Sequence, residues 1–308
     1  MSQTLTLAHL SDLHLTPLDG FGPRHWNVKR TLGYLNWHRG RKRVHRVEVI
    51  EALVADLRGL APDHVAVTGD LVNIGLPSEH AAALGWLESL GAPERVSVVP
   101  GNHDIYVQLA SDPGVERWRD YMTSDAFGVG LGLAAVDGFP YVRKLGHVAL
   151  IGLNSAEPTP PFVAAGRVGA RQLGALARAL EATATAGLAR GVLIHHPPLP
   201  GQGPPRRALT GAGELERVLS SHGAELVLHG HNHRDMLVWL DTRCGPLPVV
   251  GIASGSAARA HKDEPLARYN LFRFVFEARR VRIEHTARGL AVPGGPVVEL
   301  QHRTLAEP

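Results

Sequence analysis

Five short motifs carry side chains of the kinds that bind metal ions, and they are spread over most of this 308-residue chain. In chain order they supply Asp12 and His14 (SDLH), Asp70 (TGDLV), Asn102, His103 and Asp104 (GNHD), His195 and His196 (LIHHPP), and His231 and His233 (HGHNH). Carboxylate, amide and imidazole groups suit Mn, Fe, Zn or Co, whereas soft metal sites need sulfur. Because the chain has one cysteine, Cys244, the motifs predict a site for harder or borderline divalent ions.

A pair of such ions would suit the hydrolysis of a phosphate ester. Two metals roughly 3.5–4 Å apart can prepare a water nucleophile and hold the oxygens of an in-line displacement. Ions this close need a shared ligand, and a carboxylate can bridge them because its two oxygens carry separate lone pairs. Asp70 is the one carboxylate of its motif, so we predict that it is the bridge.

With these motifs in this order, the chain resembles the calcineurin-like metallophosphoesterases, which are marked by DxH, GD, GNHD, His and GHxH blocks. The resemblance implies two divalent or mixed-valence ions, Mn, Fe or Zn. One would be held by Asp12, His14, Asp70 and His233, and the other by Asp70, Asn102, His195 and His231. It also implies that His103 stabilises the phosphate or protonates the leaving group, with Asp104 orienting it. The stretch GDLVNIGLPSE is similar to the branch that includes bacterial cyclic nucleotide and glycerophosphodiester phosphodiesterases.

Two polar residues next to the motifs are further candidates. His195 ends an apolar run and is our metal ligand, whereas His196 is expected to support the ligands or to face substrate; simple packing beside Pro197 is its alternative. Asn73 follows Asp70 by three residues and could reach a substrate phosphate, although it could equally cap the following turn.

Short apolar runs alternate with longer amphipathic stretches, which predicts strands alternating with helices. We expect strands at 5–10, 65–68, 95–99, 191–194 and 225–228, a hairpin at 141–153 around Gly146, and helices at 47–60, 78–90 (with Ser78 as N-cap) and 170–185. Each motif follows one of these strands, where the loops of an open α/β sheet converge. From Met236 onward the pattern predicts strands in MLVWL, LPVVGIA, YNLFRFVF and RVRIEH, and no long helix.

The expected fold is therefore α/β with two sheets. The resemblance implies a four-layer α-β-β-α sandwich of two mixed sheets flanked by helices. We place no domain boundary and predict a single domain over residues 1–308, with a basic, aromatic insertion at 21–46. The Pro/Gly-rich stretches 158–162 and 197–205 are expected to be rim loops of the site, because apolar strands continue on both sides of them.

The composition is that of a globular protein able to bury a core, with 44% hydrophobic and 20% charged residues. The N-terminus lacks the charged and apolar regions of a secretory signal, and no run reaches the roughly 18 apolar residues of a membrane span. One cysteine excludes an internal disulfide framework. We expect a cytoplasmic location, with peripheral attachment to the inner face of the membrane as an alternative.

That alternative depends on residues 24–46, which we name the basic segment. It holds 8 of the 32 Lys/Arg and none of the 29 Asp/Glu, so the rest of the chain carries an acidic excess. Its aromatic and leucine residues are typical of an interfacial helix or of a surface that faces phosphates. Two hypotheses remain open: a solvated basic cover over the site, or a surface that binds an anionic substrate or membrane.

We expect hydrolysis of a small phosphodiester, of cyclic nucleotide or glycerophosphodiester type, by attack of a metal-bound hydroxide on phosphorus. An alternative is a lipid-linked nucleotide pyrophosphate, such as UDP-diacylglucosamine, which the basic segment motivates. A non-catalytic metal-binding scaffold is the alternative from another class, but such a chain would be expected to lose ligands, and none is missing here. No nucleic acid partner is expected, because the basic segment is short and no nucleic-acid-binding module is recognisable.

Overall fold

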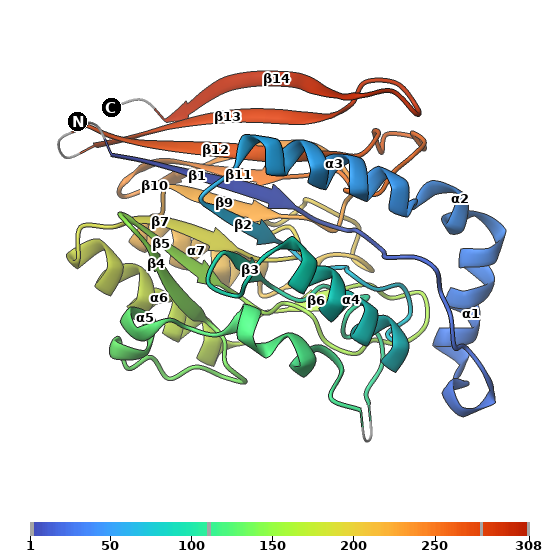
Figure 1. The fold of residues 1–308 in the computed structure, drawn as a ribbon. Helices are drawn as coiled ribbons and strands as arrows, with labels where there is room; N and C mark the ends of the chain where they lie inside the picture. The colour runs from blue at the N-terminus through green and yellow to red at the C-terminus, as the bar shows by residue number, and fades with distance from the viewer. Residues whose placement is uncertain (1–2, 110–111, 278–279, 307–308) are drawn as a thin grey trace.

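Two six-stranded mixed sheets pack face to face, and helices cover their outer faces (Figure 1). The computed structural model describes residues 3–109, 112–277 and 280–306. The four-layer α/β sandwich expected from the sequence is confirmed. Within the described residues no helix is long and apolar enough to cross a membrane.

The first sheet combines strands from the two ends of the chain. Its order is β14 (Val297–Ala306), β13 (Arg280–Leu290), β12 (Arg268–Glu277), β1 (Gln3–Leu10), β2 (His64–Val67) and β3 (Val96–Val98). β1, β2 and β3 are parallel to one another, whereas β12 to β14 form an antiparallel meander that joins the sheet beside β1. The carboxyl ends of the three parallel strands therefore lie at one edge.

The second sheet brings the remaining motif-bearing strands to the same edge of the sandwich. Its order is β10 (Met236–Thr242), β11 (Gly245–Gly251), β9 (Leu226–His229), β7 (Ala189–Leu193), β5 (Val148–Gly152) and β4 (Tyr141–Leu145). The four central strands are parallel and the two outermost strands are antiparallel to their neighbours. A two-stranded sheet, β6 (Gly166–Arg167) with β8 (Leu209–Thr210), lies apart from both.

Amphipathic helices cover the outer faces. They are α3 (Val47–Leu60) and α4 (Pro77–Leu90) over the first sheet and α6 (Ala170–Thr185) and α7 (Ala212–His222) over the second, with the short α5 (Ala126–Gly130) and the 3-10 helix η3 (Gly114–Met122) between β3 and β4. α3 buries Ile50, Leu53, Val54 and Leu57, which recur at helical spacing, against a core that also contains β1 and β12 residues. A second apolar cluster joins α6 and α7 to the second sheet.

The element boundaries agree with the sequence expectations except at a few points. α3 and α6 have the predicted limits, but α7 and β14 were not predicted. Ser78 is not the N-cap of α4: the helix begins one residue earlier, Leu76 is the cap, and Glu79 accepts hydrogen bonds from the Leu76 and Ile74 amides. The Ser78 hydroxyl instead donates to the carbonyl of Asp19. A carboxylate in the first turn thus replaces the expected serine cap.

The basic segment is helical over most of its length. It contains the 3-10 turn η1 (Pro23–His25), α1 (Val28–Asn36), the π-helical turn η2 (Trp37–Arg41) and α2 (Lys42–Val44). In Figure 1 these elements form the arm at one side of the sandwich that leads into α3. Asn27 caps α1 by accepting a hydrogen bond from the amide of Arg30. The arm packs closely against the loops after β2 and β3, because a Cβ on Gly33 would lie 2.7 Å from Ile74 in the first loop and 2.6 Å from the Tyr106 hydroxyl in the second.

Candidate dinuclear metal centre

The five motifs turn inward directly after β1, β2, β3, β7 and β9, so their side chains meet at the shared edge of the two sheets. Five of the predicted ligands have positive φ angles in the left-handed region: Asp12, His14, Asp70, His231 and His233, with φ between 44° and 70°. Residues other than glycine rarely adopt this conformation, and it costs free energy. The strain is consistent with a site in which the placement of the side chains outweighs the cost of an unfavourable backbone conformation.

One set of donor atoms surrounds Nε2 of His195. This nitrogen lies 3.2 Å from Oδ1 of Asn102, 3.2 Å from Nδ1 of His231 and 3.5 Å from Oδ2 of Asp70. The four residues are those that the resemblance assigns to one metal. Asp70, His195 and His231 also form a buried group whose ligand atoms all lie within 4.8 Å of one another.

A second set lies on the other side of Asp70. Nε2 of His14 is 3.3 Å from Nε2 of His233 and 4.0 Å from Oδ2 of Asp70, while Nε2 of His233 is 3.2 Å from Oδ1 of Asp12. Oδ2 of Asp70 thus faces both sets, which suits the predicted role of Asp70 as the shared ligand. All seven residues predicted as ligands are therefore brought together.

The donor chemistry fits two cations. Oδ1 of Asp12 is buried, and its contact among the described residues is with Nε2 of His233 at 3.2 Å, which is not a well-aligned hydrogen bond. The remote nitrogens of two rings contact backbone carbonyls, Nδ1 of His14 at 3.1 Å from Val72 O and Nδ1 of His195 at 2.6 Å from Thr68 O. Such contacts fix the tautomer and leave the Nε2 lone pair for a metal. Lone pairs that face one another repel unless a cation lies between them.

The buried carboxylates of the site need positive charge nearby, and in the protein alone two histidines supply it. Burial disfavours protonation of His195 and His233, yet the carboxylate of Asp70 raises the pKa of His195 to about 9, and Asp12 raises the pKa of His233 to about 9. In the protein without metal these rings hold protons that balance the buried carboxylates. Metal binding would displace those protons, since a histidine ligand must be neutral.

Gly101 allows the GNHD loop to approach Asp70 closely. A Cβ at this position would lie 2.2 Å from Oδ1 of Asp70 and 2.8 Å from Cε1 of His195. Its φ is not among the positive ones, so the backbone conformation of the turn does not require glycine. The residue is small because two metal-facing side chains pack against its backbone.

His103 lies beside the metal donors. Its amide donates to Oδ1 of Asp70 at 2.7 Å, and its Nδ1 contacts the carbonyl of Asn73, so that Nε2 faces the pocket. Burial lowers the pKa of His103 to about 4, with Asp70 opposing and Arg41 adding to the shift. The ring is placed where it can contact a phosphate or a leaving group.

Asp104 does not orient His103, contrary to what the resemblance implied. Its Oδ1 accepts from the amides of Leu71 and Val72 at 2.8 and 3.1 Å, and its Oδ2 accepts from those of Asp70 and Gly101, both at 2.8 Å. The carboxylate therefore ties the loop after β2 to the loop after β3, and the Asn73 carbonyl orients His103 instead.

The two candidate substrate residues, His196 and Asn73, are buried and are not among the residues that line the pocket. Nδ1 of His196 contacts the Ser155 hydroxyl at 2.8 Å and Nε2 contacts the Ala164 carbonyl at 3.2 Å, so both ring nitrogens are used within the protein. Its ring packs 4.4 Å from that of His231, which it supports. The Asn73 side chain donates to the carbonyl of Leu15. The geometry gives neither residue a direct path to substrate.

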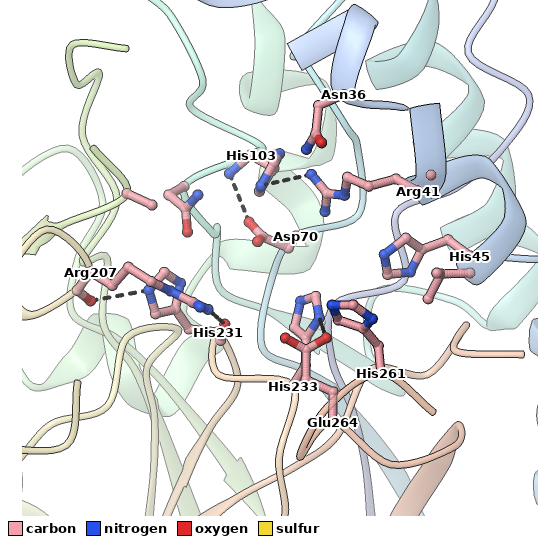
Figure 2. Close-up of a pocket in the computed structure, with 14 residues that line it drawn as sticks. Asn36, Arg41, His45, Asp70, His103, Arg207, His231, His233, His261 and Glu264 are labelled. Atoms are coloured by element: carbon pink, nitrogen blue, oxygen red, sulfur yellow. Dashed lines mark hydrogen bonds and ion pairs between the residues drawn. The ribbon is translucent and has the colours of Figure 1, made fainter. Parts of the chain in front are cut away.

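A pocket of about 510 Å³ opens over the metal donors (Figure 2). Besides predicted site residues, its lining includes residues that the sequence did not single out. Arg41 and His45 enter it from the basic segment, Arg207 from the loop before β8, and His261 and Glu264 from the loop before β12. Nδ1 of His45 contacts the Ser256 hydroxyl at 2.8 Å, and the ring joins His14 and His233 in a second possible ligand group. No motif spacing links these residues, although the charge of the basic segment was a signal.

Comparison with known proteins agrees with this geometry. A family model described as calcineurin-like phosphoesterase matches residues 5–235. The fold is similar to that of a dimetal phosphatase from Danio rerio, with 14% identity, a TM-score of 0.60 and coverage of 96% of this chain and 98% of that one. It is also similar to purple acid phosphatase PPD1 from yellow lupin (Lupinus luteus) seeds, with 12% identity, a TM-score of 0.56 and coverage of 99% of this chain and 54% of that one. No curated protein sequence matches the chain.

Proposed function

Since the chain belongs to the calcineurin-like phosphoesterase family of dimetal hydrolases, we propose that it hydrolyses a small phosphodiester, of cyclic nucleotide or glycerophosphodiester type. The observation that carries this proposal is the pair of donor sets that share Asp70 beneath an open pocket. Two bound metals would activate water and offset the negative charge on the phosphate oxygens.

The residues around the donor sets have separate tasks in this reaction. His103 presents Nε2 to the pocket and would donate a hydrogen bond or a proton to the departing alkoxide once the negative charge of a bound phosphate had raised its pKa from the value of about 4 in the protein alone. Asp104 fixes the loops that carry Asp70 and His103 through four amide hydrogen bonds. His196 holds His231 in place from behind.

A diester is preferred over a monoester for two reasons. The segment Gly69–Glu79 resembles the phosphodiesterase branch of the family in sequence. The pocket volume of about 510 Å³ also exceeds the space of a phosphate group, so the pocket can hold ester substituents as well. The pair of metals is proposed to be Mn, Fe or Zn, which suit imidazole and carboxylate ligands.

The test is a substrate comparison on protein reconstituted separately with Mn, Fe and Zn. Bis(p-nitrophenyl) phosphate, p-nitrophenyl phosphate, cyclic AMP and glycerophosphocholine should be hydrolysed with the diesters ahead in kcat/KM by about tenfold or more, which corresponds to about 1.4 kcal/mol. A preference for the monoester would contradict the diester assignment. Tightly bound metal without turnover of any ester would favour the non-catalytic scaffold.

A lipid-linked nucleotide pyrophosphate is the second candidate, because the outer side of the basic segment exposes apolar and basic groups together. Trp26, Val28 and Leu35 are 68%, 70% and 43% exposed, and Arg24 and Arg39 are also exposed. Such a surface suits peripheral contact with an anionic membrane of the inner leaflet. The protein would then act at the membrane surface.

This candidate is tested by sedimentation with anionic and neutral liposomes at two salt concentrations. Binding should require anionic lipid, weaken with salt, and weaken in a variant with Arg24→Ala and Arg39→Ala. The protein does not act at the membrane surface if it fails to bind anionic liposomes and if its activity on the UDP-lipid does not depend on detergent.

A further inference from the structure

The basic segment has two different sides. Five of its eight basic side chains are exposed: Arg24, Arg39, Lys42, Arg43 and Arg46. Lys29 and Arg30 are buried, and they attach the segment to the rest of the protein. Lys29 Nζ donates to the Tyr106 carbonyl and the Thr159 hydroxyl, both at 2.8 Å, and Arg30 donates to the carbonyls of Ile74 and Gly75. Those two cations have their partners.

Arg41 is the remaining cation, and its situation is different. Its guanidinium enters the pocket beside His103 (Figure 2), with Nη1 at 3.3 Å from Nε2 of that ring. Its Nη2 lies 2.9 Å from Nε2 of His14. Among the described residues, no carboxylate forms a salt bridge with it. A guanidinium that enters a pocket without an acidic partner is suited to an anionic ligand.

Nη2 of Arg41 donates to Nε2 of His14, and the lone pair of this nitrogen is the one that a metal would use. Nδ1 of His14 contacts the Val72 carbonyl, so Nε2 is the ring nitrogen that faces both Arg41 and the metal donors. Once a metal takes this nitrogen, Nη2 of Arg41 loses its acceptor. Leaving a partly buried guanidinium without an acceptor is unfavourable, and a phosphate oxygen would restore the hydrogen bond with opposite charge.

The position of Arg41 is fixed before any ligand arrives. The segment is anchored by Lys29 and Arg30 and by the close approach of Gly33 to Ile74 and Tyr106. Four residues after Arg41, His45 is bonded to the Ser256 hydroxyl, and its neighbour Val44 accepts from the amide of Ala258. Both ends of the helical arm are therefore attached to the body of the protein, which limits the entropy lost when a ligand binds.

We propose that Arg41 binds a non-bridging oxygen of the substrate phosphate and so makes the basic segment part of the substrate site. This inference rests on the proposed hydrolysis of a phosphoester in the same pocket. The exposed basic side chains would add only a general positive field, because water and salt screen them. One guanidinium, held at the metal donors, would carry the specific contact.

The experiment compares Arg41→Ala, Arg41→Lys and the matched control Arg43→Ala, each loaded with Mn. Metal content, affinity for inorganic phosphate by calorimetry, and kcat and KM for bis(p-nitrophenyl) phosphate are measured. Arg41→Ala should keep its metal but lose about 10- to 100-fold in phosphate affinity and in kcat/KM, as expected for one charge-assisted contact. Arg41→Lys should recover part of the loss, and Arg43→Ala should remain within about twofold of the unsubstituted protein.

Three results would overturn the proposal. The first is an Arg41→Ala protein that binds phosphate with unchanged affinity. The second is an Arg41→Ala protein that loses its metal, which would mean that Arg41 only positions His14. The third is an Arg43→Ala protein that loses as much phosphate affinity and kcat/KM as Arg41→Ala. Phosphate binding also separates the proposed hydrolysis of an ester from the proposed phosphate contact of Arg41. If the protein hydrolyses no ester but binds phosphate through Arg41, the proposed function fails while the role of Arg41 stands.

Discussion

Carboxylates occur in two very different settings in this molecule. Asp56 on α3 accepts two hydrogen bonds from Arg288 on β13, both at 2.8 Å, and one from the hydroxyl of Tyr269 on β12. Asp70 in the pocket instead has Oδ2 opposite Nε2 of His195 and Nε2 of His14, at 3.5 and 4.0 Å. The first group is satisfied by the protein's own cation, and the second faces other metal-binding atoms.

This difference separates a structural cluster from a functional one. The Asp56 cluster stabilises the packing of α3 on the first sheet and needs nothing further. The pocket needs added positive charge to balance its buried carboxylates, either as protons on His195 and His233 or as metal ions, and its backbone is strained at five ligand positions. Charge content alone would not distinguish the two, whereas the completeness of the hydrogen bonding does.

The largest effect should follow replacement of the bridging residue. Asp70→Ala removes a donor from both metal sets, so we expect loss of both metals and a fall in activity of about 1,000-fold or more. Metal analysis and kcat/KM on the best diester measure this. Asp56→Asn is the matched control and should retain metal and activity. An Asp70→Ala protein that is loaded with metal and active would remove the basis of the comparison.

His103→Ala should separate metal binding from the rate of reaction. The side chain lies beside the donor sets but is not needed by either, so the metal content should stay unchanged while kcat falls about 100- to 10,000-fold. Metal analysis and kinetics on the same sample provide the measurement. Loss of metal in this variant would instead place His103 among the ligands.

Metal removal should destabilise the whole protein by a moderate amount. Ligands that bind the folded state add stability by mass action, by about 2.7 kcal/mol at a concentration 100 times the dissociation constant. We therefore expect a chelator to lower the Tm by about 5 °C or more, and Mn, Fe or Zn to restore it. Asp70→Ala should show no such dependence on metal. Equal sensitivity in both proteins would point to a second, structural metal.

The smallest effect is expected for the satisfied cluster. Hydrogen bonding to Arg288 keeps the pKa of Asp56 below its ordinary value, so its stabilising effect is present above the unfolded pKa of about 3.9 and is lost as the pH falls through the folded pKa. Asp56→Asn should lower the unfolding free energy by about 1 kcal/mol at pH 7, and by less below about pH 4. Urea unfolding at both pH values tests the sign. A larger loss at the lower pH would contradict it.

Local sequence patterns predicted the parts of the fold that depend on local interactions. The apolar spacing of Val47–Leu60 and the Ala-rich run Ala170–Thr185 gave helices with the observed limits, because periodic burial defines them. α7 (Ala212–His222) and β14 (Val297–Ala306) were missed, because α7 lies between Gly211 and Gly223 without a side-chain cap and β14 exists only by pairing with β13. A strand needs a partner strand, even when that partner is its neighbour in the chain, so the pattern of one segment does not determine it alone.

The sequence by itself determined the chemistry of the donors, because a carboxylate, an amide or an imidazole can be recognised by type and each follows an apolar strand. Only the tertiary structure decided what surrounds them. It assigned Asp104 to backbone amides and oriented His103 by the Asn73 carbonyl. It also turned Arg41 and His45 of the basic segment into the pocket. Those contacts join residues far apart in the chain, so their geometry arises only when the two sheets and the helical arm pack together.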